Sequence, residues 1–186
     1  VASNAFVATT LAAAVASILW PSLEWILHGK PTVLGFCSGI VAGLVAITPA
    51  AGFVGSGAAV AIGALGTAVS FFAAMRLKHI LKYDDALDTF GVHGVAGTVG
   101  TILTAIFATS MINPNIQANL GGLIGNGLWV EQAKAMGITI AIALVGTLAA
   151  TAITKAVLGL RPDSEDEVAG MDYLDHGEVG YRYEEN

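Results

Sequence analysis

Charged residues are scarce in this chain. Only 12% of its 186 residues are Asp, Glu, Lys or Arg, which is about half of the ~25% that is usual in soluble domains. No charged residue occurs from Thr32 to Met75 or from Thr89 to Val130. Each of these tracts is longer than the roughly 20 apolar residues that cross a bilayer. The scarcity of charge therefore excludes an ordinary soluble domain and predicts an all-α, polytopic helical membrane protein.

Positive charge is the scarcer of the two signs, with 8 Lys and Arg against 14 Asp and Glu. A chain of this balance lacks the basic surface that nucleic-acid binding requires. Most of the acid lies near the C-terminus, at Asp163, Glu165, Asp166, Glu167, Asp172, Asp175, Glu178, Glu184 and Glu185. We therefore expect two parts, a transmembrane helical domain over residues 1–160 and an acidic tail over residues 161–186.

Residues that build enzyme and metal sites are also sparse. The one cysteine, Cys37, lies in an apolar tract and cannot form a disulfide within the chain. No second His or Cys lies three or four residues from His93, as a metal site on a helix would require. Neither a G-x-S-x-G motif nor a phosphate-binding glycine motif occurs. We therefore predict no enzyme, no cofactor and no metal.

Apolar stretches and helix breakers divide the chain into five predicted spans, at about 5–27, 33–47, 55–75, 92–111 and 135–158. Pro49 separates the second span from the third, because proline disfavours helix at the residue before it. The polar, glycine-rich segment between the fourth and fifth spans predicts a loop. Gly35, Gly39 and Gly43 recur every four residues and predict close packing against another helix.

The few cations predict the orientation of these spans. Lys30 follows the first span, three cations follow the third, and Lys155 and Arg161 follow the fifth. The connections after the second and fourth spans have no cation of their own, and only Lys134 lies on the opposite side. Positive charge in short loops marks the cytoplasmic side. We therefore expect the first, third and fifth spans to end in the cytoplasm, with the acidic tail.

His93 is the one histidine of four that falls well inside an apolar tract. Ionisable side chains in membrane spans are costly and are candidates for function. Because an unpaired cation is unfavourable in such surroundings, we expect a neutral imidazole with one donor and one acceptor nitrogen. This group suits a small hydrogen-bonding solute or a proton relay. The alternative is a structural hydrogen bond to a neighbouring helix.

Asp88 precedes His93 by about one and a half helical turns, at the expected cytoplasmic start of the fourth span. An acid in the first turn of a helix complements the helix dipole and can cap its free N–H groups. We expect this structural role for Asp88 rather than a catalytic one.

Several motifs, in the same order along the chain, resemble those of the ammonium transporter family. The segment from Asp88 to Val95 is similar to the family's tenth-helix motif. Matching motifs elsewhere are Gly29-Lys30-Pro31, Ser38-Gly39, Ala42-Gly43-Leu44-Val45 and Ile47-Thr48-Pro49-Ala50, and, in the tail, Gly170-Met171-Asp172, His176-Gly177-Glu178 and Tyr181. The similarity covers essentially the whole chain and is closest to the bacterial branch.

The resemblance implies an eleven-helix fold whose first ten helices form two inverted repeats, of which this chain would supply helices seven to eleven. The chain opens directly into an apolar helix without Met, and we expect the N-terminal half to be missing or to be a separate chain. The resemblance also implies that His93 is the second of two pore histidines. Asp88, Thr89 and Phe90 would support it on the same helix, with Thr89 standing where a larger aliphatic residue is common.

The function that the resemblance implies is transport of ammonium or ammonia across the cell membrane by a homotrimer. The implied regulatory residues of the tail, which would receive a cytoplasmic PII-type signal protein, are Gly170, Asp172, His176, Gly177, Glu178 and Tyr181. Three alternatives remain open: an ammonium sensor of the same fold, a Rhesus-type neutral ammonia channel, and a purely structural membrane subunit. Gly94 disfavours the Rhesus type, which usually has Asn after the Val-His pair.

Overall fold

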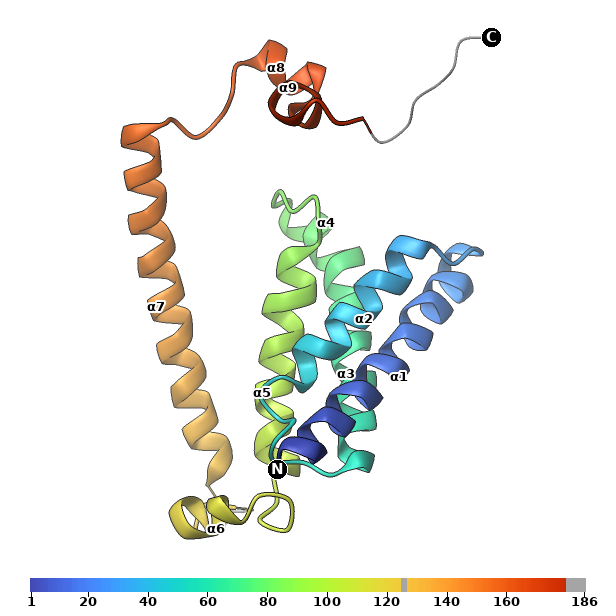
Figure 1. Cartoon of the computed structure of the whole chain (residues 1–186), viewed down its shortest axis with the longest axis vertical. Coiled ribbons are helices and arrows are strands. Elements are labelled where there is room, and N and C mark those ends of the chain that lie inside the picture. Colours follow the sequence, from blue (N-terminus) through green and yellow to red (C-terminus); the bar gives the residue numbers. More distant parts are fainter. Residues whose placement is uncertain (125–126, 180–186) are drawn as a thin grey trace. The chain divides into compact units, whose positions relative to one another are not determined.

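The computed structural model describes residues 1–124 and 127–179 (Figure 1). These residues form helices and connecting segments, and no strand occurs among them. The chain divides into two compact units, Val1–Gly137 and Ile138–Asn186. The predicted division at residue 160 into a membrane domain and a tail stays a prediction.

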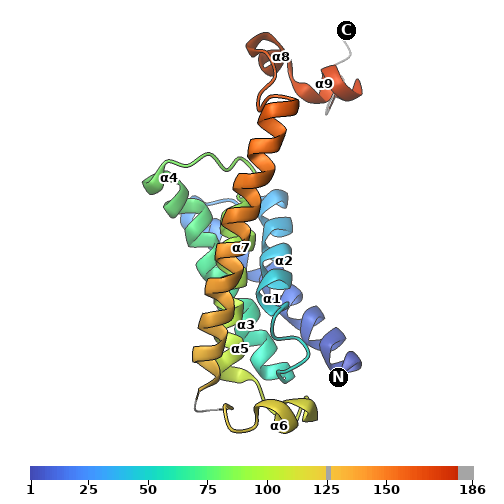
Figure 2. The ribbon, with the colours of Figure 1, turned by 90° about the vertical axis from the view of Figure 1, so that its left-hand side faces the viewer.

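The first unit is a helical bundle. Its elements are α1 (Ala2–His28), α2 (Val33–Ile47), α3 (Ser56–Phe72), the π-helical turns η1 (Ala73–Leu77) and η2 (Phe90–Val95), α4 (Lys78–Leu81), α5 (Ala96–Phe107) and α6 (Pro114–Leu120). Helix α1 packs against α2 and α3, and α5 packs against the same two helices. Both views of the ribbon show α1, α2, α3 and α5 side by side (Figures 1 and 2).

Helix α7 (Leu128–Val157) begins in the first unit and continues through the second, where α8 (Ser164–Ala169) and α9 (Met171–His176) follow. Leu128, the first residue of α7, is buried. Gly170 and Gly177 flank α9 with φ angles of 98° and 65°. Glycine adopts such angles without steric cost. A glycine is therefore favoured at both ends of this short helix.

Four helical stretches are long and apolar enough to cross a membrane: Ala2–His28, Ser56–Leu81, Phe90–Phe107 and Leu128–Val157. The predicted fold class, a polytopic helical membrane protein, is confirmed. Helix α2 has the predicted bounds, but its 15 residues reach only about 22 Å at 1.5 Å per residue. A bilayer core is about 30 Å thick, so α2 is too short to count as a full span by itself.

Two predicted boundaries are wrong. The segment expected to be a loop contains α6, which starts because Pro114 occupies its first position and the Asn113 side chain accepts a hydrogen bond from Asn115 N at 3.2 Å. Helix α7 starts at Leu128 rather than near residue 135, since Glu131 and Lys134 pair at 2.8 Å on its first turns. A charged pair three residues apart supports a helix and does not mark its end.

Small residues hold the bundle together. The buried residues of α1 recur every four positions, at Ala8, Ala12, Ala16, Trp20 and Glu24, and this face meets α2 and α3. A Cβ atom on Gly43 would lie 2.4 Å from the Ala16 Cβ, and one on Gly63 would lie 2.7 Å from the Ala12 Cα. The predicted role of the α2 glycines, close helix packing, is confirmed.

The one carboxylate buried in this bundle, among the residues that the structure describes, belongs to Glu24. Its oxygens accept hydrogen bonds from Thr32 N at 2.8 Å and from the Thr32 hydroxyl at 3.0 Å. The same hydroxyl oxygen accepts from Gly35 N at 2.8 Å and so caps α2. Because a buried carboxylate needs such partners, Glu24 ties the end of α1 to the start of α2.

The first prediction concerns this close packing. We expect Gly63→Ala to lower the free energy of unfolding by about 1–3 kcal/mol, because the new methyl group would overlap the backbone of α1. Gly57→Ala, on the same helix, is the matched control, because no atom lies within 4 Å of the place its methyl group would take. It should stay within about 1 kcal/mol of wild type. Thermal unfolding in detergent measures both, and equal stabilities would contradict the packing role.

Candidate functional site

His93 lies in η2, at the start of the membrane-length stretch Phe90–Phe107. Gly91 and Val92 are buried against the bundle, whereas the His93 side chain is exposed. Among the described residues no hydrogen-bond partner of the imidazole is found. The structure therefore places a polar side chain on the side of a membrane-length helix that the Val1–Gly137 unit leaves uncovered.

The turn that carries His93 is anchored to α3 from the opposite side. The Ser70 hydroxyl donates a hydrogen bond of 2.7 Å to the Gly91 carbonyl, and this contact is buried. One turn further along, a Cβ atom on Gly91 would lie 3.1 Å from Ala74 N and 3.2 Å from Ala74 Cα. Backbone atoms yield less readily than a flexible side chain, so any residue larger than glycine at position 91 would press η2 away from Ala74.

The start of the same turn is capped by a carboxylate, but not the predicted one. Asp85 accepts hydrogen bonds from Thr89 N at 2.8 Å and from Phe90 N at 2.9 Å. The Asp88 carboxylate instead pairs with Lys78, and Asp88 itself has a φ angle of 53°. The prediction that Asp88 caps the helix is therefore wrong in its choice of residue, because the chain reverses direction at Asp88 and turns its side chain towards α4.

Thr89 and Phe90 are both exposed at the beginning of η2. The Phe90 ring meets the Tyr83 ring edge to face, with 5.7 Å between the ring centroids. It also lies beside Gly94, where a Cβ atom would be 2.9 Å from the ring. Phe90 therefore packs along the backbone next to His93, and a larger residue at position 94 would displace it.

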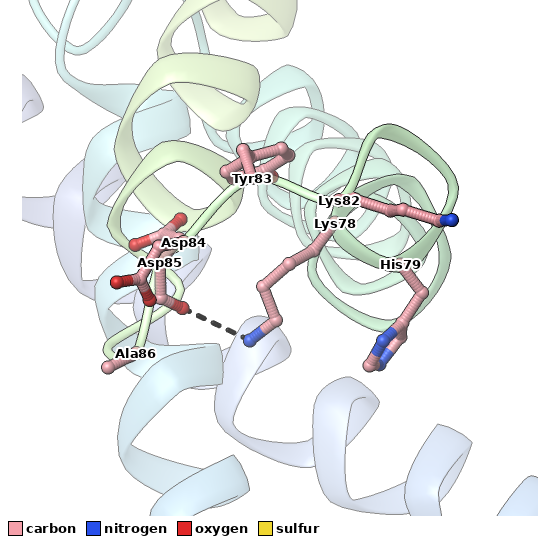
Figure 3. A pocket seen from close by; sticks show the side chains of 7 residues that line it. All are labelled: Lys78, His79, Lys82, Tyr83, Asp84, Asp85 and Ala86. Carbon is pink, nitrogen blue, oxygen red and sulfur yellow. Dashed lines mark hydrogen bonds between the residues drawn. The ribbon is translucent and has the colours of Figure 1, made fainter.

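An open cavity of about 390 Å³ lies between α4 and the segment that follows it (Figure 3). Its lining residues are Lys78, His79, Lys82, Tyr83, Asp84, Asp85 and Ala86. The Lys78 ammonium group reaches across it and donates to the Asp85 carbonyl at 3.1 Å. His93 is not part of this cavity. The hydrogen bond between Lys78 and Asp85 connects α4 to the residue that caps η2. It therefore holds the segment that leads into η2.

The predicted regulatory residues of the tail lie in and around α9. Asp172 and His176 belong to the helix, and Glu178 N donates to the Asp172 carbonyl at 3.1 Å after the chain turns at Gly177. These residues form a compact exposed turn. Tyr181, which we also predicted, lies outside the described residues. In the described part of the chain, no group of three His, Cys, Asp or Glu residues could hold a metal ion.

A comparison with protein-family models matches residues 1–181 to the Ammonium Transporter Family. The chain belongs to this family. It is 43% identical to an ammonium transporter of Bacillus subtilis over 98% of the chain and 45% of that protein. It is 44% identical to an ammonium transporter of Aquifex aeolicus over 97% of the chain and 42% of that protein. The chain thus spans less than half the length of these relatives, which are named as transporters and not as enzymes.

Solved structures agree with this family membership. The chain matches Mep2 of Saccharomyces cerevisiae with a TM-score of 0.76 at 33% identity, over 88% of this chain and 38% of that one. It matches a sensor Amt protein with a TM-score of 0.65 at 26% identity, over 94% of this chain and 42% of that one. Both matches support the helical membrane fold of this family member.

Sequence reasoning missed Ser70, Lys78 and Asp85 as residues of the His93 environment. Asp85 lies four residues before Thr89, so its capping role was open to prediction from an acid before a helix start. Ser70 carried no such signal, because a single hydroxyl in an apolar helix does not indicate which carbonyl it meets. Lys78 is one of the three cations after the third predicted span, and the sequence indicated only that this end of the span lies on the cytoplasmic side.

The second prediction separates the two neighbouring acids of this family member. We expect Asp85→Ala to lower the free energy of unfolding by about 1 kcal/mol, because two N–H groups at the start of η2 lose their acceptor. Asp84→Ala is the control, since Asp84 is exposed and lines the same cavity. Thermal unfolding measures the difference, and a larger loss for Asp84→Ala would show that the cap is assigned to the wrong residue.

Proposed function

We propose that the complete protein transports ammonium or ammonia across a membrane and that His93 lines the path of the solute. The observation that carries this proposal is the uncovered imidazole in a membrane-length helix whose other side is anchored. A polar group of this kind is costly in lipid and is therefore expected to face a path or another part of the protein. Membership of the Ammonium Transporter Family supports ammonium or ammonia as the solute.

The chemistry of a neutral imidazole fits this solute. Ammonia can donate to the acceptor nitrogen of the ring and accept from the donor nitrogen. The ammonium cation has only donors, so it can use the acceptor nitrogen of the ring but not the donor nitrogen. An unpaired cation is also costly in an apolar path. We therefore propose that ammonia, rather than the ammonium cation, is the form that passes the His93 ring.

This chain supplies one wall of the proposed path. The exposed apolar side chains beyond His93 on the same helical stretch include Ile102 and Ile106. We propose that the N-terminal half of the transporter covers them and His93 and provides the second histidine. A homotrimer of such complete units is the proposed assembly. Asp88, Thr89 and Phe90 would then border the cytoplasmic end of the path.

We propose the cell membrane as the location, with the tail in the cytoplasm. The support is the placement of the cations, because Arg76 and Lys78 lie in the last two turns of the long helical stretch Ser56–Leu81 and Lys82 follows it. Lys155 and Arg161 lie at or after the end of α7 in the same way. Positive charge gathers on the cytoplasmic side of short loops.

The sensor alternative has no observation that favours it over transport. The sensor Amt protein is 26% identical to this chain, whereas the relatives named ammonium transporters are 43% and 44% identical. For the Rhesus-type channel, the close fit of Phe90 beside Gly94 adds a physical reason against Asn at position 94. We therefore retain transport as the proposed function.

The third prediction tests the role of His93. In cells that carry the complete protein, we expect His93→Ala to reduce methylammonium uptake by at least about tenfold, the loss that removal of one well-placed hydrogen-bonding group causes. His93→Glu should change the selectivity or the rate, since it replaces a neutral ring with a carboxyl group. His79→Ala, an exposed histidine on α4, is the control. Unaltered rate and selectivity in both His93 variants would remove His93 from the path.

The fourth prediction concerns the tail, for which we propose regulation and docking of a PII-type signal protein. The support is the exposed turn around α9, where Asp172, His176 and Glu178 combine charge with Met171 and Tyr173. Deleting residues 162–186 should change how uptake responds to nitrogen supply while the membrane bundle still assembles. Uptake and size-exclusion profiles of the truncated and complete protein measure this, and an unchanged response would count against regulation.

A further inference from the structure

We propose that Ser70 is a positioning residue for His93, an inference that rests on the proposed transport function. Ser70 belongs to α3 and does not lie on the exposed side of η2 with the imidazole. Its side chain is fully buried, and its hydroxyl donates a hydrogen bond to the Gly91 carbonyl at 2.7 Å. That carbonyl belongs to the residue two positions before His93.

The direction of the imidazole follows from this contact. Two residues rotate a helix by about 200° in the α form and by somewhat less in the wider π form, so His93 lies on roughly the opposite side from Gly91. Gly91 is held against α3 by the Ser70 hydroxyl and by the close approach of Ala74. The turn therefore cannot rotate about its axis without losing the hydrogen bond or the close contact, and His93 is kept pointing away from α3.

The π-helical form of this turn gives the Ser70 hydrogen bond a second effect. A π-helical turn holds one more residue than an α-helical turn and is a rare form that often occurs at functional sites. If residues 90–95 reverted to regular α-helix, each side chain of this turn would point in a different direction about the helix axis relative to α5. The Ser70 hydrogen bond attaches the wider turn to a neighbouring helix, so it opposes this reversion and keeps the imidazole in place.

Thr67 offers a matched control on the same helix. It lies one turn before Ser70 and is fully buried, and its hydroxyl has no hydrogen-bond partner within the described part of the chain. Thr67→Val thus removes a buried hydroxyl at nearly constant volume without removing a hydrogen bond to η2. Ser70→Ala removes the anchoring hydroxyl, and Ser70→Thr retains one.

The test combines uptake with a direct observation of the ring. The complete protein, labelled with ¹⁵N-histidine in lipid bilayers, gives imidazole signals by solid-state NMR, and those of His93 are assigned by their loss in His93→Ala. We expect Ser70→Ala to shift or split the His93 signals and to lower methylammonium uptake by about 10-fold to 100-fold, the effect of a misplaced reacting group. Thr67→Val should keep both readouts near wild type, and Ser70→Thr, which keeps the hydroxyl, should shift the His93 signals less than Ser70→Ala.

The other outcomes distinguish the positioning role of Ser70 from the transport role of His93. Unchanged His93 signals in Ser70→Ala, or equal shifts in Thr67→Val, would overturn the positioning role. Shifted signals in Ser70→Ala together with normal uptake in both Ser70→Ala and His93→Ala would leave the positioning role standing and overturn the transport role of His93. If Ser70→Ala does not accumulate in the membrane, Ser70→Cys, which keeps only a weak donor, replaces it with the same expected shifts.

Discussion

Close approach of helix backbones is the constraint on which the bundle depends. Lipid tails are as apolar as the side chains, so helices in a membrane associate through packing and interhelical hydrogen bonds rather than through burial from water. In this chain such close approaches occur where a glycine faces an alanine: Gly63 against Ala12, Gly91 against Ala74 and Gly100 against Ala46. Each pair fixes how its helix is rotated about its own axis. Any other rotation would place a side chain between the two backbones.

Fixed rotation gives the polar groups their roles. Ser70 and Glu24 are turned inward and find partners on the neighbouring segment, at Gly91 and Thr32. His93 is turned outward on a helix whose inward side is fully engaged. The same packing that satisfies the interior therefore produces the exposed imidazole, and this link between packing and site explains why residues on α3 bear on a histidine that they do not touch.

The sequence was a good guide where a boundary depends on local chemistry. The end of α2 followed from Thr48-Pro49, and the membrane class followed from the missing charge. Boundaries failed where an interaction outside the local pattern decides them, as with the Glu131–Lys134 pair in α7. At the site, His93 was found because it is costly in lipid, whereas the choice of Asp85 over Asp88 as cap depends on a backbone reversal, and the role of Ser70 depends on a contact between distant segments.

The most direct measurement is a density map of the complete protein in a lipid bilayer, at a resolution that places side chains. We predict that the His93 imidazole borders a narrow path between helices and that the Ser70 hydroxyl lies within hydrogen-bond distance of the Gly91 carbonyl. A map in which the imidazole contacts lipid tails, or is enclosed by side chains with no path beside it, would contradict the role proposed for His93.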